Sequence, residues 1–150
     1  MRAGWPGRRH SAIGSASAVE LAAAGFDVCV VDLDRSALAP ARAGVESAGG
    51  NCRPYVCDVT SPGRVEATVA EIVADAGRVD VLVNGAGIVH GDDLLELTFE
   101  TWRRVMSVNA DGTFLMGLAT ARAMARQPPS ALLGRRGMIV NISSAAASSG

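Results

Sequence analysis

The chain has 150 residues, of which 49% are hydrophobic and 4% aromatic, so it is long enough for one domain with a core of alanine, valine and leucine. Its formal net charge of −1 gives no reason to expect nucleic acid or an anionic membrane as a partner. Cys29, Cys52 and Cys57 lack metal-like spacing and are expected to be reduced thiols in a cytoplasmic protein without a metal site. No uncharged run approaches the ~20 residues needed to cross a bilayer, and no apolar segment follows the Arg-rich start, so a soluble, untargeted chain is expected.

Helical and strand-like patterns alternate along the chain after residue 10. Residues 1–10 combine glycines, a proline and arginines without a β-branched residue, and are predicted to be irregular. The elements expected in order are a helix over 11–24, a strand over 26–32, a helix over 35–48, a strand over 52–59, a helix over 62–76, a strand over 79–83, a helix over 98–127 and a strand over 138–142. This alternation predicts a parallel sheet with right-handed crossovers.

Single residues carry predictions about the helices. Pro40 is expected to interrupt the second helix. Ser61 is a candidate cap for the third helix, which has Pro62 at its first position. Asn109 and Gly112 interrupt the middle of the long helical segment, since both are poor helix-interior residues.

The apolar run Val79–Val83 ends in the small-residue turn Asn84-Gly85-Ala86-Gly87. A short apolar run bounded by glycine predicts a strand buried on both faces. At the carboxyl end of a parallel strand, a loop of glycine and alanine lets a flat ligand approach the backbone. On these residues alone, a plain turn and a ligand-binding loop are equally supported.

A dinucleotide site needs a glycine turn that opens a helix and an acid ~20 residues later for the ribose hydroxyls. Here Ile13 and Gly14 open the first helix, and Asp32 ends the next strand 18 residues after Gly14. The spacing fits, although most of the expected glycines are missing, and we favour the ribose role of Asp32 over an ordinary strand-end acid. Asp58, in the equivalent place on the next strand, either accepts from an adenine amino group or caps the turn before Ser61.

Motifs in a fixed order resemble the short-chain dehydrogenase/reductase family. They are Asp32, Cys57-Asp58-Val59, Asn84-Gly85-Ala86-Gly87, Ser107-Val108-Asn109 and Ile139-Val140-Asn141-Ile142-Ser143-Ser144. The resemblance covers roughly Ser11 to the last residue, and the joint occurrence is specific although each motif is weak alone. Gly85 stands where the family has the second Asn of Asn-Asn-Ala-Gly.

The resemblance implies roles for these residues. Asp32 would hold the adenosine ribose and favour NAD over NADP, and a carboxylate independently repels a 2′-phosphate. Asn109 would bend its helix and position a water in a proton relay, while Ser144, with Ser143 as the adjacent candidate, would bond the substrate oxygen. The residues implied to line the cofactor are Ile13, Gly14, Asp32, Leu33, Asp58, Val59, Asn84, Ala86 and Gly87.

Two parts of the family pattern are missing. The family's acid/base is a Tyr in Tyr-x-x-x-Lys after the serine, whereas Tyr55 is the only tyrosine of this chain and no lysine occurs. The family's first strand and Thr-Gly-x-x-x-Gly-x-Gly turn would fall where residues 7–14 keep only the last glycine, Gly14. We therefore expect a fragment, incomplete at both ends, with an altered gene boundary at its start. Without the central strand, the strands ending at Asp32 and Asn84 would expose unpaired backbone groups.

The predicted fold is an α/β Rossmann-type doubly wound parallel sheet with helices on both faces, truncated, in which residues 11–150 form a partial NAD(P)-binding domain. The predicted function is that of an NAD-dependent oxidoreductase moving a hydride between nicotinamide and a small carbonyl or alcohol substrate, such as a 3-oxoacyl compound, with the 150-residue chain inactive alone. The alternative is a non-catalytic nucleotide-binding or interaction protein of the same fold. A homo-oligomer formed through the apolar face of residues 102–118 is also considered.

Overall fold

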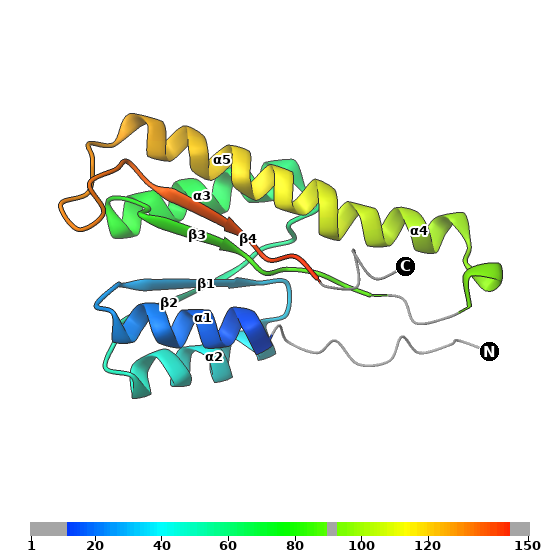
Figure 1. The fold of residues 1–150 in the computed structure, drawn as a ribbon, viewed down its shortest axis with the longest axis horizontal. Helices are drawn as coiled ribbons and strands as arrows, with labels where there is room; N and C mark the ends of the chain where they lie inside the picture. Colours follow the sequence, from blue (N-terminus) through cyan, green and yellow to red (C-terminus); the bar gives the residue numbers. More distant parts are fainter. Residues whose placement is uncertain (1–11, 90–92, 145–150) are drawn as a thin grey trace.

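The computed structural model describes residues 12–89 and 93–144 (Figure 1). The predicted irregular segment 1–10 lies outside these residues. The elements follow in the order α1 (Ala12–Ala23), β1 (Val28–Asp32), α2 (Arg35–Ser47), β2 (Cys52–Val56), α3 (Pro62–Ala76), β3 (Val81–Asn84), the 3₁₀ turn η1 (Leu94–Glu96), α4 (Phe99–Met106), the π-helical turn η2 (Ser107–Gly112), α5 (Thr113–Arg126) and β4 (Met138–Asn141). The predicted α/β class with parallel strands is confirmed. No described helix is long and apolar enough to cross a membrane.

The four strands form two parallel pairs. In the first strand pair, β1 lies beside β2 with Val28 opposite Cys52, and in the second strand pair, β3 lies beside β4 with Val81 opposite Met138. β1 and β3 are the facing strands of the two pairs and point the same way in Figure 1. They belong to separate two-stranded sheets, and no described strand lies between them. Among residues 12–89 and 93–144, the strands ending at Asp32 and Asn84 share no ladder neighbour.

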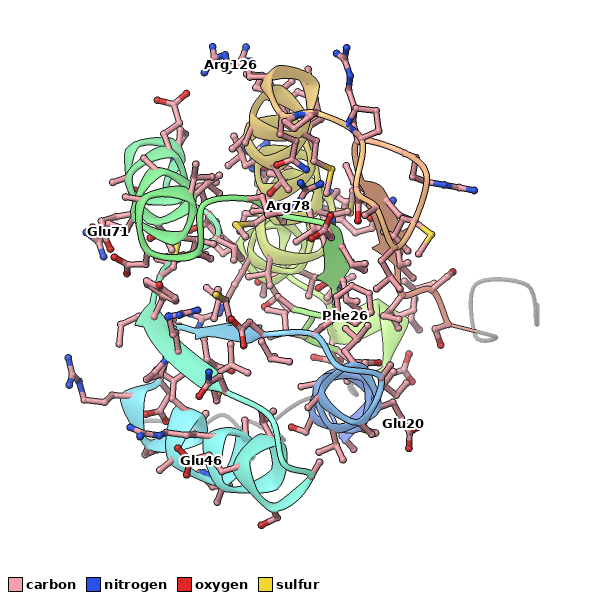
Figure 2. The ribbon with its side chains drawn as sticks, turned by 90° about the vertical axis from the view of Figure 1, so that its left-hand side faces the viewer. Glu20, Phe26, Glu46, Glu71, Arg78 and Arg126 are labelled. Carbon is pink, nitrogen blue, oxygen red and sulfur yellow. The ribbon has the colours of Figure 1, made fainter. Side chains whose placement is uncertain are left out.

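Two apolar clusters form the core. The first core joins α1, β1 and α2 through Ala18, Ala22, Val28 and Val45. The second core lies among α3, α5 and the strands, and its buried members are Cys57, Val65, Val69 and Met116. Val31 of β1 and Leu82 of β3 both pack against the second core, so this cluster holds the two strand pairs together. Figure 2 shows charged side chains such as Glu46, Glu71 and Arg126 pointing outward from the helices that cover the strands.

The ends of α2 and α3 follow from local chemistry. Asp34 caps α2 by accepting a hydrogen bond from the N–H of Ser36 at 2.8 Å. The predicted interruption at Pro40 is wrong, because α2 continues through it; the buried Leu38 and Val45 on the same helix offset the backbone bond that proline removes. α3 begins at Pro62 as predicted and ends at Gly77, which has the left-handed φ of 79° that favours glycine.

Hydrogen bonds from the side-chain amide of Gln127 join the end of α5 to the start of the second strand pair. Gln127 accepts from the N–H of Val79 at 3.1 Å and donates to the carbonyl of Val79 at 2.7 Å. The same amide nitrogen donates to the carbonyl of Arg136, just before β4. One glutamine therefore fixes where β3 and β4 begin relative to α5.

The strands are shorter and less buried than predicted. β3 begins at Val81 rather than Val79, and β2 ends at Val56, so Asp58 lies in the following loop. All four residues of β3 are half-buried, and Val140 in β4 is 36% exposed. The prediction that the strand over 79–83 is fully buried on both faces is therefore wrong. Both α5 and α1 contact β3, but no described strand lies on its second edge, so its residues remain partly exposed.

Candidate cofactor-binding and active site

The predicted site residues gather at one edge of the strands. β1 ends at Asp32 and β3 ends at Asn84, while Asp58 follows β2 and Ser144 follows β4 by a few residues. Because all four strands are parallel within their pairs and β1 and β3 point the same way, these carboxyl ends meet at the side of the molecule nearest α4 in Figure 1. Open α/β sheets bind ligands at this edge.

The start of α1 lies at the same edge. Ile13 and Gly14 occupy its first turn, and Ile13 is 56% exposed. Leu33, which follows β1, is 49% exposed. Both exposed apolar side chains therefore belong to segments at this edge, Ile13 to the start of α1 and Leu33 to the residue after β1.

Asp32 fixes the turn that follows β1. Its Oδ1 accepts from the N–H of Asp34 at 2.8 Å, and no other described residue engages Oδ2. Asp32 is partly exposed, and among the described residues no hydrogen bond to its second carboxylate oxygen is found. This is the chemistry needed to accept from two neighbouring hydroxyl groups of a ribose.

Asp58 organises the loop after β2. Its Oδ1 accepts from the hydroxyl of Thr60 at 2.7 Å and from the N–H of Thr60 at 2.9 Å, and its carbonyl accepts from the N–H of Ser61. The Thr60 hydroxyl and N–H lower the pKa of Asp58 because both donate to the charged carboxylate. These bonds correspond to the turn-capping alternative. Ser61 occupies the helix cap position but makes no side-chain cap bond.

Asn84 connects three elements at the edge. Its Nδ2 donates to Oδ1 of Asn141 at 2.9 Å and to the carbonyl of Thr113 at 3.4 Å, so β3, β4 and α5 are joined at one point. Sequence reasoning singled out Asn84 but missed Asn141 as its partner. Both asparagines are the last residues of paired strands, and this register is not visible in the sequence.

Asn109 clamps the loop after β3. Its Oδ1 accepts from the N–H of Ile88 at 2.8 Å, and its Nδ2 donates to the carbonyl of Ile88 at 2.9 Å. A Cβ on Gly87 would lie 3.5 Å from Oδ1 of Asn109, which is ordinary contact distance. The Asn109 side chain therefore bonds both backbone groups of Ile88, as a neighbouring strand would. These bonds hold the loop containing Ala86 and Gly87 against η2.

The predicted interruption of the long helix is confirmed, and it takes the form of the π-helical turn η2. Gly112 is buried there, and a Cβ added to it would lie 2.7 Å from Cγ2 of Val59. The hydroxyl of Thr113 donates to the carbonyl of Asn109 at 2.8 Å. Glycine thus permits the close approach of Val59, and the threonine satisfies a carbonyl in the widened turn.

Tyr55 is placed away from Ser144. It lies in β2, and its hydroxyl donates to Oδ2 of Asp75 in α3 at 2.8 Å. Burial, together with this bond to a carboxylate, raises the pKa of the Tyr55 phenol, which is the opposite of what a base at neutral pH requires. The only tyrosine of the chain therefore does not complete the site.

Other surface features lie apart from the predicted residues. A shallow hollow of about 510 Å³ on α4 is lined by Glu100, Thr101, Arg103, Arg104 and Ser107, none of them a predicted site residue. No group of His, Cys, Asp or Glu within residues 12–89 and 93–144 is arranged to hold a metal ion.

Comparison with known proteins identifies relatives across nearly the whole chain. The short chain dehydrogenase family model matches residues 9–150. The chain is 41% identical to the short-chain reductase protein NovJ of Streptomyces niveus, covering 90% of this chain and 49% of that protein. It is 34% identical to 3-oxoacyl-[acyl-carrier-protein] reductase FabG of Thermotoga maritima, covering 89% of this chain and 52% of that protein.

Solved structures agree in fold. An NAD⁺-bound xylitol dehydrogenase superposes with a TM-score of 0.82 at 36% identity, covering 92% of this chain and 51% of that one. A short-chain type dehydrogenase/reductase from Mycobacterium marinum also gives 0.82, at 31% identity, over 90% of this chain and 52% of that one. The chain spans about half the length of these relatives. With its two strand pairs, its carboxyl-edge residues and a family match over residues 9–150, this chain belongs to the short-chain dehydrogenase/reductase family.

Proposed function

We propose that this chain supplies the cofactor-binding part of an NAD-dependent oxidoreductase that moves a hydride between nicotinamide and a small carbonyl or alcohol compound. Members of its family are oxidoreductases that use nicotinamide cofactors. The observation that carries the proposal is the meeting of Asp32, Asn84 and the loop held by Asn109 at one strand edge. FabG, whose name specifies a 3-oxoacyl substrate, and D-threitol dehydrogenase of Mycolicibacterium smegmatis motivate the substrate class.

The residues present fit the adenosine end of a dinucleotide. The uncommitted Oδ2 of Asp32 would accept from ribose hydroxyls, and its charge would repel the 2′-phosphate of NADP. The exposed side chains of Ile13 and Leu33 would cover the adenosine, and Asp58 and Val59 would contact the adenine from the next loop. Gly14 would bring the start of α1 toward the pyrophosphate.

The residues that follow β3 and β4 would bind the nicotinamide end of the cofactor and the substrate. Bound nicotinamide supplies or accepts the hydride. Ala86 and Gly87 present backbone without bulky side chains, and Asn109 holds their loop in place through Ile88. Because both amide atoms of Asn109 are engaged, its part in a proton relay would run through backbone groups and water. Ser144, with Ser143 beside it, would donate to the substrate oxygen and stabilise negative charge there.

A non-catalytic nucleotide-binding protein is the second candidate. It is supported by the bond of Tyr55 to Asp75, which engages the tyrosine of these 150 residues away from Ser144. We expect the 150-residue chain alone to bind NAD without turning over a ketone. The test for turnover is NADH oxidation with a panel of ketones, including a 3-oxoacyl thioester. Carbonyl-dependent loss of NADH would contradict the expected inactivity.

Calorimetric titration of the purified chain with NAD and with NADP tests the binding proposal. Asp32→Asn should weaken NAD binding about tenfold or more and reduce the preference over NADP, because a charged hydrogen-bond acceptor is lost. Asp27→Asn, one residue before the opposite end of β1, is the matched control and should leave both affinities unchanged. Equal affinity of the unmodified chain for NAD and NADP would overturn the assignment of Asp32, and binding of neither would overturn the proposal.

The proposal also covers the oligomeric state and the cellular location of the chain. Phe99, Trp102 and Phe114 on α4 and α5 are 71%, 50% and 63% exposed, which supports a homo-oligomer formed through this apolar face. Sedimentation of Trp102→Glu beside the unmodified chain tests it, since the charge should dissociate such an assembly. Cys29, Cys52 and Cys57 are free thiols, which is consistent with the reducing, cytoplasmic location that we propose.

A further inference from the structure

The side-chain amides of Asn84 and Asn141 meet where β3 and β4 end. The two asparagines lie opposite each other in the strand register. Nδ2 of Asn84 donates to Oδ1 of Asn141 at 2.9 Å, and the carbonyl of Asn84 accepts from the N–H of Ile142 at 3.0 Å. The end of β3 is therefore joined to the β4 segment both through the backbone and through a side-chain bond.

A backbone carbonyl of α5 fixes the polarity of this side-chain bond. Nδ2 of Asn84 also lies 3.4 Å from the carbonyl oxygen of Thr113, and a carbonyl oxygen can only accept. The atom of Asn84 that faces Thr113 must therefore be the nitrogen. A primary amide nitrogen has two protons, so Thr113 and Asn141 together accept both of them, and Asn141 must offer its oxygen.

The oxygen of the Asn84 amide is the atom that remains for a ligand. Asn84 is half-buried, and no hydrogen bond to its Oδ1 is found among residues 12–89 and 93–144. Its nitrogen lies against α5, since a Cβ added to Gly117 would be 3.9 Å from Nδ2. The Asn84 side chain can therefore accept a hydrogen bond from a bound molecule, but it has no proton left to donate.

Asn141 supplies the shorter of the two bonds that hold this amide. The 2.9 Å between Nδ2 and Oδ1 of Asn141 is the usual length of an N–H···O bond, whereas the 3.4 Å to Thr113 is longer than most. Without Asn141, the longer and weaker bond would hold the amide alone. The amide would then be able to turn and present its nitrogen in place of its oxygen.

We propose that Asn141 is a positioning residue for the cofactor, which acts through Asn84. By accepting from Nδ2, Asn141 makes Asn84 present Oδ1 to a hydrogen-bond donor on the nicotinamide half of the dinucleotide. The nicotinamide half is chosen because Asn84 directly precedes the loop that contains Ala86 and Gly87. This role rests on the proposed NAD binding, and it requires no contact between Asn141 and the cofactor.

NMR titration of the purified 150-residue chain with NAD, nicotinamide mononucleotide and adenosine monophosphate tests this role. Asn141→Leu keeps the size of the side chain but removes the acceptor, and should weaken binding of NAD and of nicotinamide mononucleotide at least tenfold. Asn141→Ala removes the same acceptor without adding apolar bulk and should behave alike. Binding of adenosine monophosphate, which lacks the nicotinamide half, should stay within twofold in both variants.

Two further variants serve as controls. Asn141→Asp retains an acceptor oxygen in the same place and should stay within threefold of the unmodified chain for all three ligands. Asn51→Leu makes the same substitution at an exposed asparagine before β2, at the opposite end of the strands, and should change no affinity.

The Asn84 side chain also gives a measurement without cofactor. Exchange of its Nδ2 protons with water, followed by NMR, should be at least tenfold slower in the unmodified chain and in Asn141→Asp than in Asn141→Leu. Exchange at the side-chain amide of the exposed Asn51 provides the internal reference.

Several results would overturn the role of Asn141. They are equal exchange at Asn84 in all variants, loss of binding in Asn141→Asp, and equal losses for nicotinamide mononucleotide and adenosine monophosphate, which would indicate a general effect on the strands. Absence of binding by the unmodified chain would overturn the proposed function together with this role. Binding of NAD that Asn141→Leu leaves unchanged would overturn this role alone.

Discussion

The two strand pairs are built from similar apolar runs but reach different degrees of burial. In the first strand pair, Val28 is buried in the first core and Val31 packs on the second core. In the second strand pair, the residues of β4 are all exposed to at least 36%, although Met138, Ile139 and Val140 are as apolar as their counterparts in β1. The burial of a strand is thus decided by the elements that cover it as well as by its own side chains.

The second core is the feature that both strand pairs share, and its loss should have the largest effect. Met116→Ala should lower the free energy of unfolding by about 2–5 kcal/mol, because Met116 is 6% exposed and its removal leaves a cavity beneath both pairs. Urea denaturation followed by circular dichroism measures this. Leu132→Ala is the control, since Leu132 is 67% exposed and its loss should cost about 0.5 kcal/mol or less. If β1 and β2 kept their stability in Met116→Ala, as judged by hydrogen exchange, the second core would not join the pairs.

Gly112 tests how closely the loop after β2 must approach the long helix. Gly112→Ala should destabilise by about 1–3 kcal/mol, because its Cβ would lie 2.7 Å from Val59. Gly63→Ala, in a helix position with nothing within 4 Å of the new Cβ, should instead stabilise by about 0.5–1 kcal/mol. Thermal unfolding of the two variants distinguishes close packing from a general effect of alanine. Equal shifts in the same direction would contradict the packing explanation.

Asn109 tests whether the loop after β3 depends on its clamp. Asn109→Ala removes two exposed hydrogen bonds to Ile88 and should cost about 1 kcal/mol. The more specific result is faster hydrogen exchange at the Ile88 amide with little change at Val30, which lies in the first strand pair. An unchanged Ile88 amide would show that the loop is held by other contacts.

Substitution of Asp58 should have the smallest effect on stability, and this effect should depend on pH. Since its pKa in the folded chain is lowered below 3.8 by Thr60, its contribution to stability is present above pH 3.8 and is lost as the pH falls through the folded-state value. Asp58→Asn should therefore be less stable than the unmodified chain at pH 7, with the difference disappearing in acid. Denaturation midpoints across this pH range measure the effect. Thr60→Val should bring the pKa of Asp58 back toward 3.8 in an NMR titration.

The sequence predicted features that rest on local chemistry. The start of α3 at Pro62, its end at Gly77 and the disturbance around Asn109 and Gly112 were all expected from residue preferences, and all are present. The pairing of β1 with β2 and of β3 with β4 follows the parallel arrangement expected from the alternating pattern.

Features that depend on distant contacts were not predictable in the same way. Pro40 is tolerated because tertiary burial of its helix outweighs one backbone bond. The bond between Asn84 and Asn141 depends on a strand register between residues 57 positions apart, and the clamp on Ile88 uses backbone atoms that carry no sequence signal. The proposed cofactor roles of Asp32 and Ser144 remain predictions for the binding experiments.

The register of the strands sets an order for folding during synthesis. Val28 and Cys52 pair across a short stretch of chain, so α1, β1, α2 and β2 can assemble once residue 56 has left the ribosome. Val81 must wait for Met138, with α3, α4 and α5 in between. Closing that longer loop is entropically more demanding and slower. We therefore expect the first strand pair to form before the second strand pair.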